Sequence, residues 1–191
     1  MHRDSRFRLG VLLVIFAAGC SQLRVADPTS PYFLPPPGSQ VVVKQRLEVP
    51  PGMTRVYLQH GKVIPKSERN DYAVNCNFEI NTLSDLPRHI DAGIYTVTKT
   101  RRRTDSIVSR EPVHVASLAM SMDDRGGGSA LVFEQVRMSL TSTPPSDIRE
   151  LACRGVMTEP DAVELPTLAE MRQALGDYAE IRVPEEGGLL H

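Results

Sequence analysis

The residues of this chain that could do chemistry are its cysteines, its histidines and one run of arginines. A thiol enzyme needs a cysteine beside a base, a metal site needs clustered ligands, and an anion site needs guanidinium groups. The cysteines are Cys20, Cys76 and Cys153, the histidines are His2, His60, His89, His114 and His191, and the arginines are Arg101, Arg102 and Arg103. Their spacing decides which of these sites the chain can build.

The spacing offers no catalytic or metal site. The five histidines are scattered without ligand spacing, and two of them lie near the ends of the sequence. The chain lacks a G-x-S-x-G turn and an H-E-x-x-H motif, and Gly126-Gly127-Gly128 lacks the Lys-Ser/Thr ending of a phosphate loop. We therefore expect a protein that is not an enzyme and that uses no metal and no cofactor.

Arg101-Arg102-Arg103, with Lys99 and Arg110 nearby, is the one charge cluster that suggests binding. Guanidinium groups match phosphate geometry, so the run could contact lipid phosphate, lipopolysaccharide or an acidic partner. The alternative is a solvated hairpin end whose charges protect an edge strand. The usual behaviour of charge runs favours this second interpretation.

Residues 1–19 have the features of a secretory signal peptide. Three arginines, Arg3, Arg6 and Arg8, precede an apolar run over 9–18 that ends in small residues. A membrane-spanning helix needs about 20 apolar residues, so this run is too short to cross a bilayer.

Ala17-Ala18-Gly19-Cys20 resembles the lipobox of bacterial lipoproteins, although the family most often has leucine where this chain has Ala17. The resemblance implies that the chain is cleaved before Cys20 and that Cys20 carries acyl chains such as palmitate. Ser21 stands where aspartate would resemble an inner-membrane retention signal, so an outer-membrane lipoprotein facing the periplasm is expected. The alternative is an ordinary secreted protein in which Cys20 is an incidental thiol.

With Cys20 assigned to lipid, Cys76 and Cys153 remain as a pair in an oxidising compartment, which predicts a disulfide. Both fall on the apolar faces of predicted strands, so these strands are expected to be neighbours or to face each other across a core. Two buried free thiols are the alternative.

The charge of the chain does not favour a nucleic-acid partner. Removing residues 1–19, with three arginines and one aspartate, changes the formal net charge from −1 to about −3. Nucleic-acid binding would require a basic footprint instead. The expected partners are the membrane, through lipid on Cys20, and an envelope protein.

The elements that must position these residues are mostly strands. Apolar alternation predicts strands over 41–49, 54–60, 72–80, 94–100, 113–122, 130–142, 148–155 and 179–183. Along 130–142 the apolar phase changes, which predicts a β-bulge or a bend near Glu134-Gln135. Thr167 and Glu170 form a capping box that should begin a short helix, and Gly176 is suited to end it.

The sum of these elements is a mainly β fold, an antiparallel β-sandwich or partly open barrel of seven or eight strands with one short C-terminal helix. Four regions are expected: a signal peptide over 1–19, the lipidated cysteine and a proline-rich tether over 20–40, a β-rich periplasmic domain over 41–184, and a tail over 185–191.

Three further segments resemble an uncharacterised family of small proteobacterial lipoproteins. They are Arg55-Val56-Tyr57-Leu58-Gln59-His60-Gly61, Cys76-Asn77-Phe78-Glu79-Ile80 and Leu151-Ala152-Cys153. The resemblance supplies no activity and no binding residue. We expect a non-enzymatic, lipid-anchored envelope module that presents a surface to a partner. The alternative is a small-ligand or lipid carrier with a cavity inside the β domain.

Overall fold

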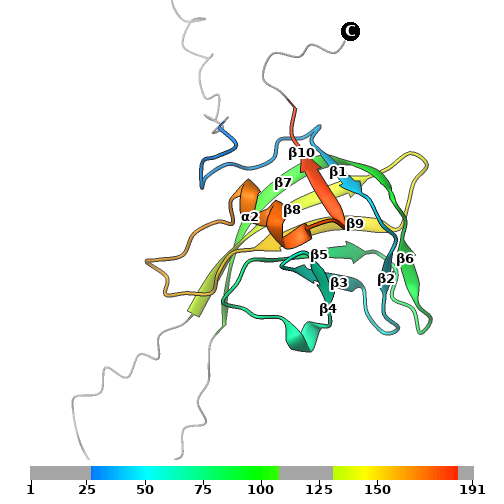
Figure 1. The fold of residues 1–191 in the computed structure, drawn as a ribbon, viewed down its shortest axis with the longest axis horizontal. Helices are drawn as coiled ribbons and strands as arrows, with labels where there is room; N and C mark the ends of the chain where they lie inside the picture. The colour runs from blue at the N-terminus through cyan, green and yellow to red at the C-terminus, as the bar shows by residue number, and fades with distance from the viewer. Residues whose placement is uncertain (1–26, 108–130, 185–191) are drawn as a thin grey trace, which may run out of the picture.

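The computed structural model describes residues 27–107 and 131–184. Its main element is one eight-stranded antiparallel sheet that curls into a half-barrel, with the helix α2 (Leu168–Leu175) packed on one face (Figure 1). Across the sheet the strands are β10 (Ala179–Arg182), β1 (Gln40–Val43), β7 (Gly93–Ile107), β8 (Leu131–Thr141), β9 (Ile148–Arg154), β5 (Asn75–Ile80), β3 (Arg55–Gln59) and β4 (Lys62–Ile64). The predicted mainly β, partly open barrel with a late helix is confirmed.

Smaller elements flank the sheet. The strands β2 (Leu47–Val49) and β6 (Arg88–Ile90) pair with each other as a two-stranded sheet, and a 3-10 turn covers Lys66–Glu68. The sequence pattern had joined β1 and β2 into one strand over 41–49, whereas the chain leaves the main sheet after Val43. Within the two described ranges, no helix is long and apolar enough to cross a bilayer.

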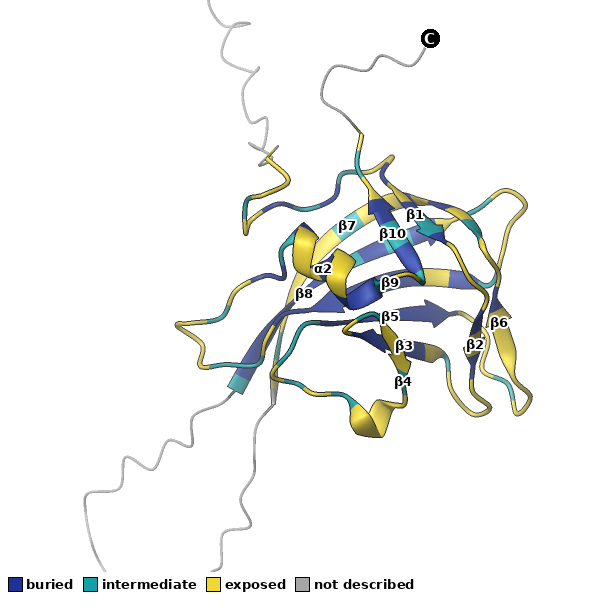
Figure 2. Cartoon of the chain, viewed as in Figure 1, coloured by how far each residue is buried: buried dark blue, intermediate teal, exposed yellow. Residues whose placement is uncertain are grey.

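The apolar core lies between the sheet and α2. Alternate side chains of the central strands point to this side, among them Val56, Leu58, Phe78, Met138 and Leu151, and all are almost fully buried. The helix contributes Leu168, Met171, Ala174 and Leu175 to the same core. Figure 2 shows β5 buried along its whole length, so side chains on both of its faces are covered.

The helix begins and ends where the sequence predicted. The Glu170 amide donates to the Thr167 hydroxyl at 3.3 Å, and the Thr167 amide donates to the Glu170 carboxylate at 2.8 Å. The helix ends at Gly176, whose φ of 55° favours glycine. A Cβ atom on Gly176 would lie 2.4 Å from the Cα of Gly61 in the β3–β4 turn, so only glycine permits this close packing.

Cys76 and Cys153 are joined by a disulfide, in agreement with the predicted pairing. They lie directly opposite each other in the antiparallel pair of β5 and β9, with their Cα atoms 4.0 Å apart. Both side chains are fully buried under α2, and 77 positions separate them in the sequence. The bridge therefore fixes two strands at the centre of the sheet.

The first form of the prediction near Glu134-Gln135, a β-bulge, is wrong. β8 pairs with β7 in regular register from Leu131 to Ser139, and the irregularity lies in β7, where Thr98 is the extra residue between Val97 and Lys99. The apolar phase of β8 changes because both of its faces are covered. Phe133 packs on the side away from α2, whereas Val136, Met138 and Leu140 face the core.

Two other expectations concern the neighbours of β8. The strand predicted over 94–100 continues to Ile107, so Arg101-Arg102-Arg103 lies within β7 and not at its end. The strand predicted over 113–122 lies outside the described residues.

The proline-rich segment is packed against the sheet from Phe33 onward. The Phe33 ring is 4% exposed and belongs to the core cluster, and the Gly38 amide donates to the Val97 carbonyl at 2.8 Å. The hydroxyl of Thr100 donates to the carbonyl of Pro35. Residues 33–40, expected to be part of the tether, therefore contact the domain.

Candidate functional site: an arginine-lined cleft

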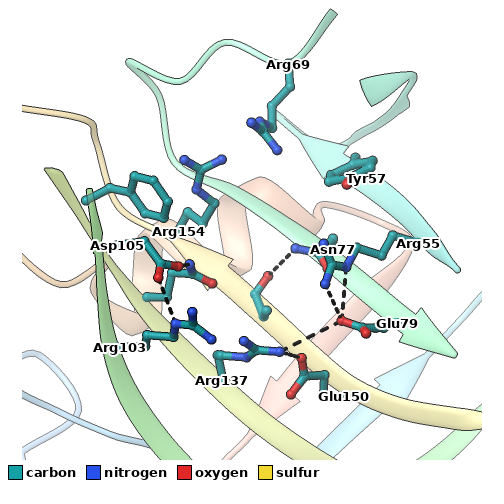
Figure 3. Close-up of a pocket in the computed structure, with 13 residues that line it drawn as sticks. Arg55, Tyr57, Arg69, Asn77, Glu79, Arg103, Asp105, Arg137, Glu150 and Arg154 are labelled. Carbon is teal, nitrogen blue, oxygen red and sulfur yellow. Dashed lines mark hydrogen bonds and ion pairs between the residues drawn. The ribbon is translucent and has the colours of Figure 1, made fainter. Parts of the chain in front are cut away.

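A cleft of about 280 Å³ opens on the face of the main sheet that points away from α2 (Figure 3). Its walls come from β3, β5, β9, β8 and β7 together with the loop before β5. The lining residues are Arg55, Tyr57, Arg69, Asn77, Glu79, Arg103, Asp105, Phe133, Gln135, Arg137, Glu150, Ala152 and Arg154. The strand residues among them alternate with the core residues, which is why they share the opposite face.

The register of the strands explains the hollow. Arg137, Ala152, Asn77 and Tyr57 are successive partners across β8, β9, β5 and β3. Ala152 has the shortest side chain of this row, and long side chains stand around it. The floor of the cleft is therefore low at Ala152, and the arginines form its walls.

One end of the cleft is held by two buried carboxylates. Glu79 pairs with Arg55 at 2.9 Å and with Arg149 at 3.2 Å, and Glu150 pairs with Arg137. Burial opposes the charge of Arg55, but the hydrogen bond and charge of Glu79, with Tyr57 also contributing, raise the pKa of Arg55. These contacts satisfy both carboxylates.

The other end is less well balanced. Arg69 and Arg154 both contact the same Oδ1 atom of Asp71, at 2.8 Å and 3.2 Å. The guanidinium carbon of Arg154 lies 3.4 Å from the centre of the Phe133 ring, in a cation–π contact. Burial and, to a lesser extent, the nearby charge of Arg69 lower the pKa of Arg154. Asp105 also acts on the charge of Arg154, but it accepts a hydrogen bond from Arg103, so Asp71 is the carboxylate that pairs with both Arg69 and Arg154.

The charges of the cleft do not cancel. Its lining holds five arginines and three carboxylates, a surplus of two positive charges. Counting the two charged neighbours that pair with the lining, Asp71 and Arg149, leaves this surplus unchanged. The whole chain, by contrast, carries a formal net charge of −1.

Three polar atoms of the cleft residues are buried without a hydrogen-bond partner in the described part of the chain. They are Oδ1 of Asn77, Nε of Arg137 and Nε of Arg154. The residues Asn77 and Arg154 are only 6% and 7% exposed. A buried polar group without a partner typically costs about 1–3 kcal/mol, so such atoms mark a place where a ligand group would be stabilised.

The structure separates the three arginines of the predicted cluster. Arg103 lines the cleft, and its Nε donates to Asp105 at 2.7 Å. Arg101 is the strand partner of Arg137 and is exposed beside the cleft. Arg102 lies on the other face and pairs with Glu134. The run therefore does not form one surface. It lies within a long strand and not at a hairpin end, but its three residues are exposed, and beyond Val97 the described part of β7 pairs only with β8, as the edge-strand interpretation predicts.

The remaining sequence candidates lie elsewhere. His60 is in the β3–β4 turn and His89 is in β6, and neither lines the cleft. Cys20 and His114 fall outside the described residues, so the lipid site stays a prediction. Among the described residues, no group of three or more histidine, cysteine, aspartate or glutamate side chains could hold a metal ion.

Most residues of the cleft were not predicted from the sequence. Asn75, Asn77 and Glu79 alternate with the core residues of β5, and all three are buried. The available signal was that polar positions of opposite charge recur on the same face of several strands. Only the register between strands shows that these side chains lie close together. Alternation along a single strand does not specify that register.

Comparison of the chain with protein-family models, curated proteins and solved structures gives no match. The cleft is therefore interpreted from its own geometry.

Proposed function

We propose that this chain is a non-enzymatic binding module of the bacterial cell envelope, held at the outer membrane by lipid on Cys20. Its working surface is the arginine-lined cleft, which recognises an anionic group of an envelope component. The signal peptide and the lipobox-like residues before Cys20 support the location. The observation that carries the binding role is a partly buried cleft with two surplus positive charges and unpaired polar atoms.

The chemistry of the lining favours binding over catalysis. The described lining residues include no histidine, cysteine, serine or lysine that could act as a nucleophile or as a base near neutral pH. Glu79, Glu150 and Asp105 already accept hydrogen bonds from Arg55, Arg137 and Arg103. Carboxylates held in this way are positioned to orient arginines, which then bind anions.

The alternative is a carrier of a small ligand or a lipid with a cavity inside the domain. The structure bears on which of these ligands such a cavity could hold. The side of the sheet that faces α2 is occupied by buried apolar side chains such as Phe78 and Met171. The cleft on the other side is lined mainly by charged groups. This arrangement favours a polar, anionic ligand over an apolar one.

Two measurements in cells test the proposal. Radiolabelled palmitate should label the full-length protein, and the label should disappear in Cys20→Ser. A photo-crosslinking amino acid at position 103, on the wall of the cleft, should give adducts that depend on the lipid anchor. The matched control is position 173, where Gln173 is exposed on α2. An unlabelled wild-type protein would contradict the anchor, and equal adducts from both positions would contradict the assignment of the cleft.

A further inference from the structure

We infer that the cleft binds a phosphate monoester in its doubly charged form, next to a hydroxyl or amine group of the same ligand. This inference rests on the proposed binding role of the cleft and names the chemical class that it takes. It follows from the charge balance at the Asp71 end, from the unpaired atoms of Asn77 and Arg154, and from the size of the cleft.

The charge balance favours a dianion. The carboxylates Glu79 and Glu150 are occupied by arginines at one end, whereas Arg69 and Arg154 share a single oxygen of Asp71 at the other. The lining as a whole has two positive charges more than its carboxylates neutralise. A phosphate monoester carries about −1.5 to −2 charges at neutral pH and has three acceptor oxygens, which match this surplus.

Arg154 is the strongest single pointer to an anion. Its side chain is 8% exposed, its Nε has no hydrogen-bond partner, and Phe133 covers one face of its guanidinium group. The lowered pKa of Arg154 has burial as its main cause, so the positive charge is held there at a cost. A further anion beside Arg154, in addition to Asp71 and Asp105, would reduce this cost and would give the unpaired Nε–H group an acceptor.

Asn77 indicates what accompanies the phosphate. Its side-chain nitrogen donates to the Ala152 carbonyl at 3.4 Å, which leaves Oδ1 as a buried acceptor without a partner. A phosphate dianion has no proton to donate to this atom. A hydroxyl or amine next to the phosphate would supply the missing donor.

The volume of the cleft limits the size of the ligand. A volume of about 280 Å³ is near the lower end of the range of roughly 300–1,000 Å³ for ligand pockets. It suits one phosphorylated sugar or polyol and not an acyl chain. Such a group occurs both as a free sugar phosphate and as the head group of a phosphorylated lipid, and the two sources share this chemistry.

Titration calorimetry of the full-length protein in detergent tests the inference. The probes are inorganic phosphate, glucose 1-phosphate, glucose and dimethyl phosphate, a diester with one charge. Glucose 1-phosphate should bind most tightly because it meets both the arginines and Asn77, inorganic phosphate should bind more weakly, and glucose and dimethyl phosphate should not bind measurably.

The variant Arg69→Gln should weaken phosphate and glucose 1-phosphate binding by about tenfold, since it removes one charge-assisted contact and leaves Asp71 paired with Arg154. The matched control is Arg88→Gln, which removes the same charge from an ion pair with Asp147 remote from the cleft lining. Circular dichroism verifies that both variants fold. Equal weakening by the two substitutions, equally tight binding of dimethyl phosphate, or no saturable phosphate binding would overturn the inference.

A short-chain phosphatidic acid distinguishes the two sources. Tighter binding of phosphatidic acid than of glucose 1-phosphate assigns the cleft to a lipid head group, and the reverse order assigns it to a free ester. Failure of the inference is separable from failure of the proposed function. If phosphate esters do not bind while adducts still form from position 103, the ligand class is wrong and the binding role of the cleft stands.

Discussion

Glu134 shows how a single residue can be charged and buried within an apolar face. It lies in β8 on the side of the sheet that faces α2 and is 2% exposed. Arg102 donates to both of its oxygens, at 2.8 Å and 2.9 Å, and the Thr104 hydroxyl donates at 2.7 Å. The hydrogen bond with Arg102 is the main cause that lowers the pKa of Glu134. The pair stabilises the fold only while Glu134 is ionised.

The substitution Glu134→Gln should therefore destabilise the protein at neutral pH. We expect a loss of about 1–2 kcal/mol in the free energy of unfolding, because a charge-assisted pair is lost but Arg102 remains half-exposed to solvent. Urea denaturation of wild type and variant measures it. Glu48→Gln, at an exposed position of β2, is the matched control and should leave the midpoint unchanged.

The same pair predicts a pH dependence with a definite sign. Because the folded-state pKa of Glu134 lies below its unfolded value of about 4.3, its stabilisation is complete above that value and is lost as pH falls through the folded pKa. The difference between wild type and Glu134→Gln should stay constant above about pH 5.5 and shrink in more acidic solution. A difference that grows on acidification would contradict this assignment.

Some of the contacts between residues could be predicted from the sequence, and others could not. The capping residues Thr167 and Glu170 and the cysteine pair act locally or through strand phase, so the sequence located them. The pairing of Arg102 with Glu134 was not foreseen, because it joins two strands whose register the sequence does not contain. The cleft could not be predicted for the same reason, because its walls come from five strands whose register the sequence does not contain.

At the scale of elements, the disulfide ties β5 to β9 at the centre of the sheet. The double variant Cys76→Ala/Cys153→Ala should lose roughly 2–5 kcal/mol of stability, since the bridge closes a long loop in the unfolded chain. Equilibrium unfolding in urea measures the loss, and Cys20→Ser serves as a control that removes a cysteine but leaves the bridge. Equal midpoints for the double variant and the control would contradict the structural role.

The capping box makes a smaller and separate contribution. Thr167→Ala removes the hydroxyl that accepts from the Glu170 amide, and we expect a loss of about 1 kcal/mol. Thr167→Ser keeps an acceptor at the same position and should retain most of the stability. Thermal unfolding followed by circular dichroism compares the two. A loss of similar size in the serine variant would show that the hydroxyl is not the relevant group.

At the scale of the whole molecule, one glycine contact joins the helix to the edge of the sheet. Gly176→Ala would place a Cβ atom 2.4 Å from the Gly61 Cα and would also strain a positive φ, so we expect a loss of about 2 kcal/mol or more. Gly52→Ala is the control, because Gly52 has a φ of 70° but open space around it. Chemical denaturation should show the larger loss at Gly176, and equal losses would mean that the close contact contributes nothing.

The fold class was predictable because strand alternation and turn residues recur along the whole chain. Of the predicted sandwich and partly open barrel, the structure has the partly open barrel. Alternation along the strands could not distinguish the two. A single sheet buries one face against α2 and covers much of the other with its own arginines and carboxylates. Alternation along β5 likewise does not show that its polar side chains, Asn77 and Glu79, are buried in the lining of the cleft.

The packing of Phe33 on the domain limits how far the protein can reach. If Cys20 carries the lipid, only 13 positions separate the anchor from the first core residue. A fully extended chain spans at most about 3.6 Å per residue, so this linker can be at most about 47 Å long. The cleft could then bind only components that lie within about that distance of the membrane surface. A longer linker between Ser21 and Pro28 would increase this distance.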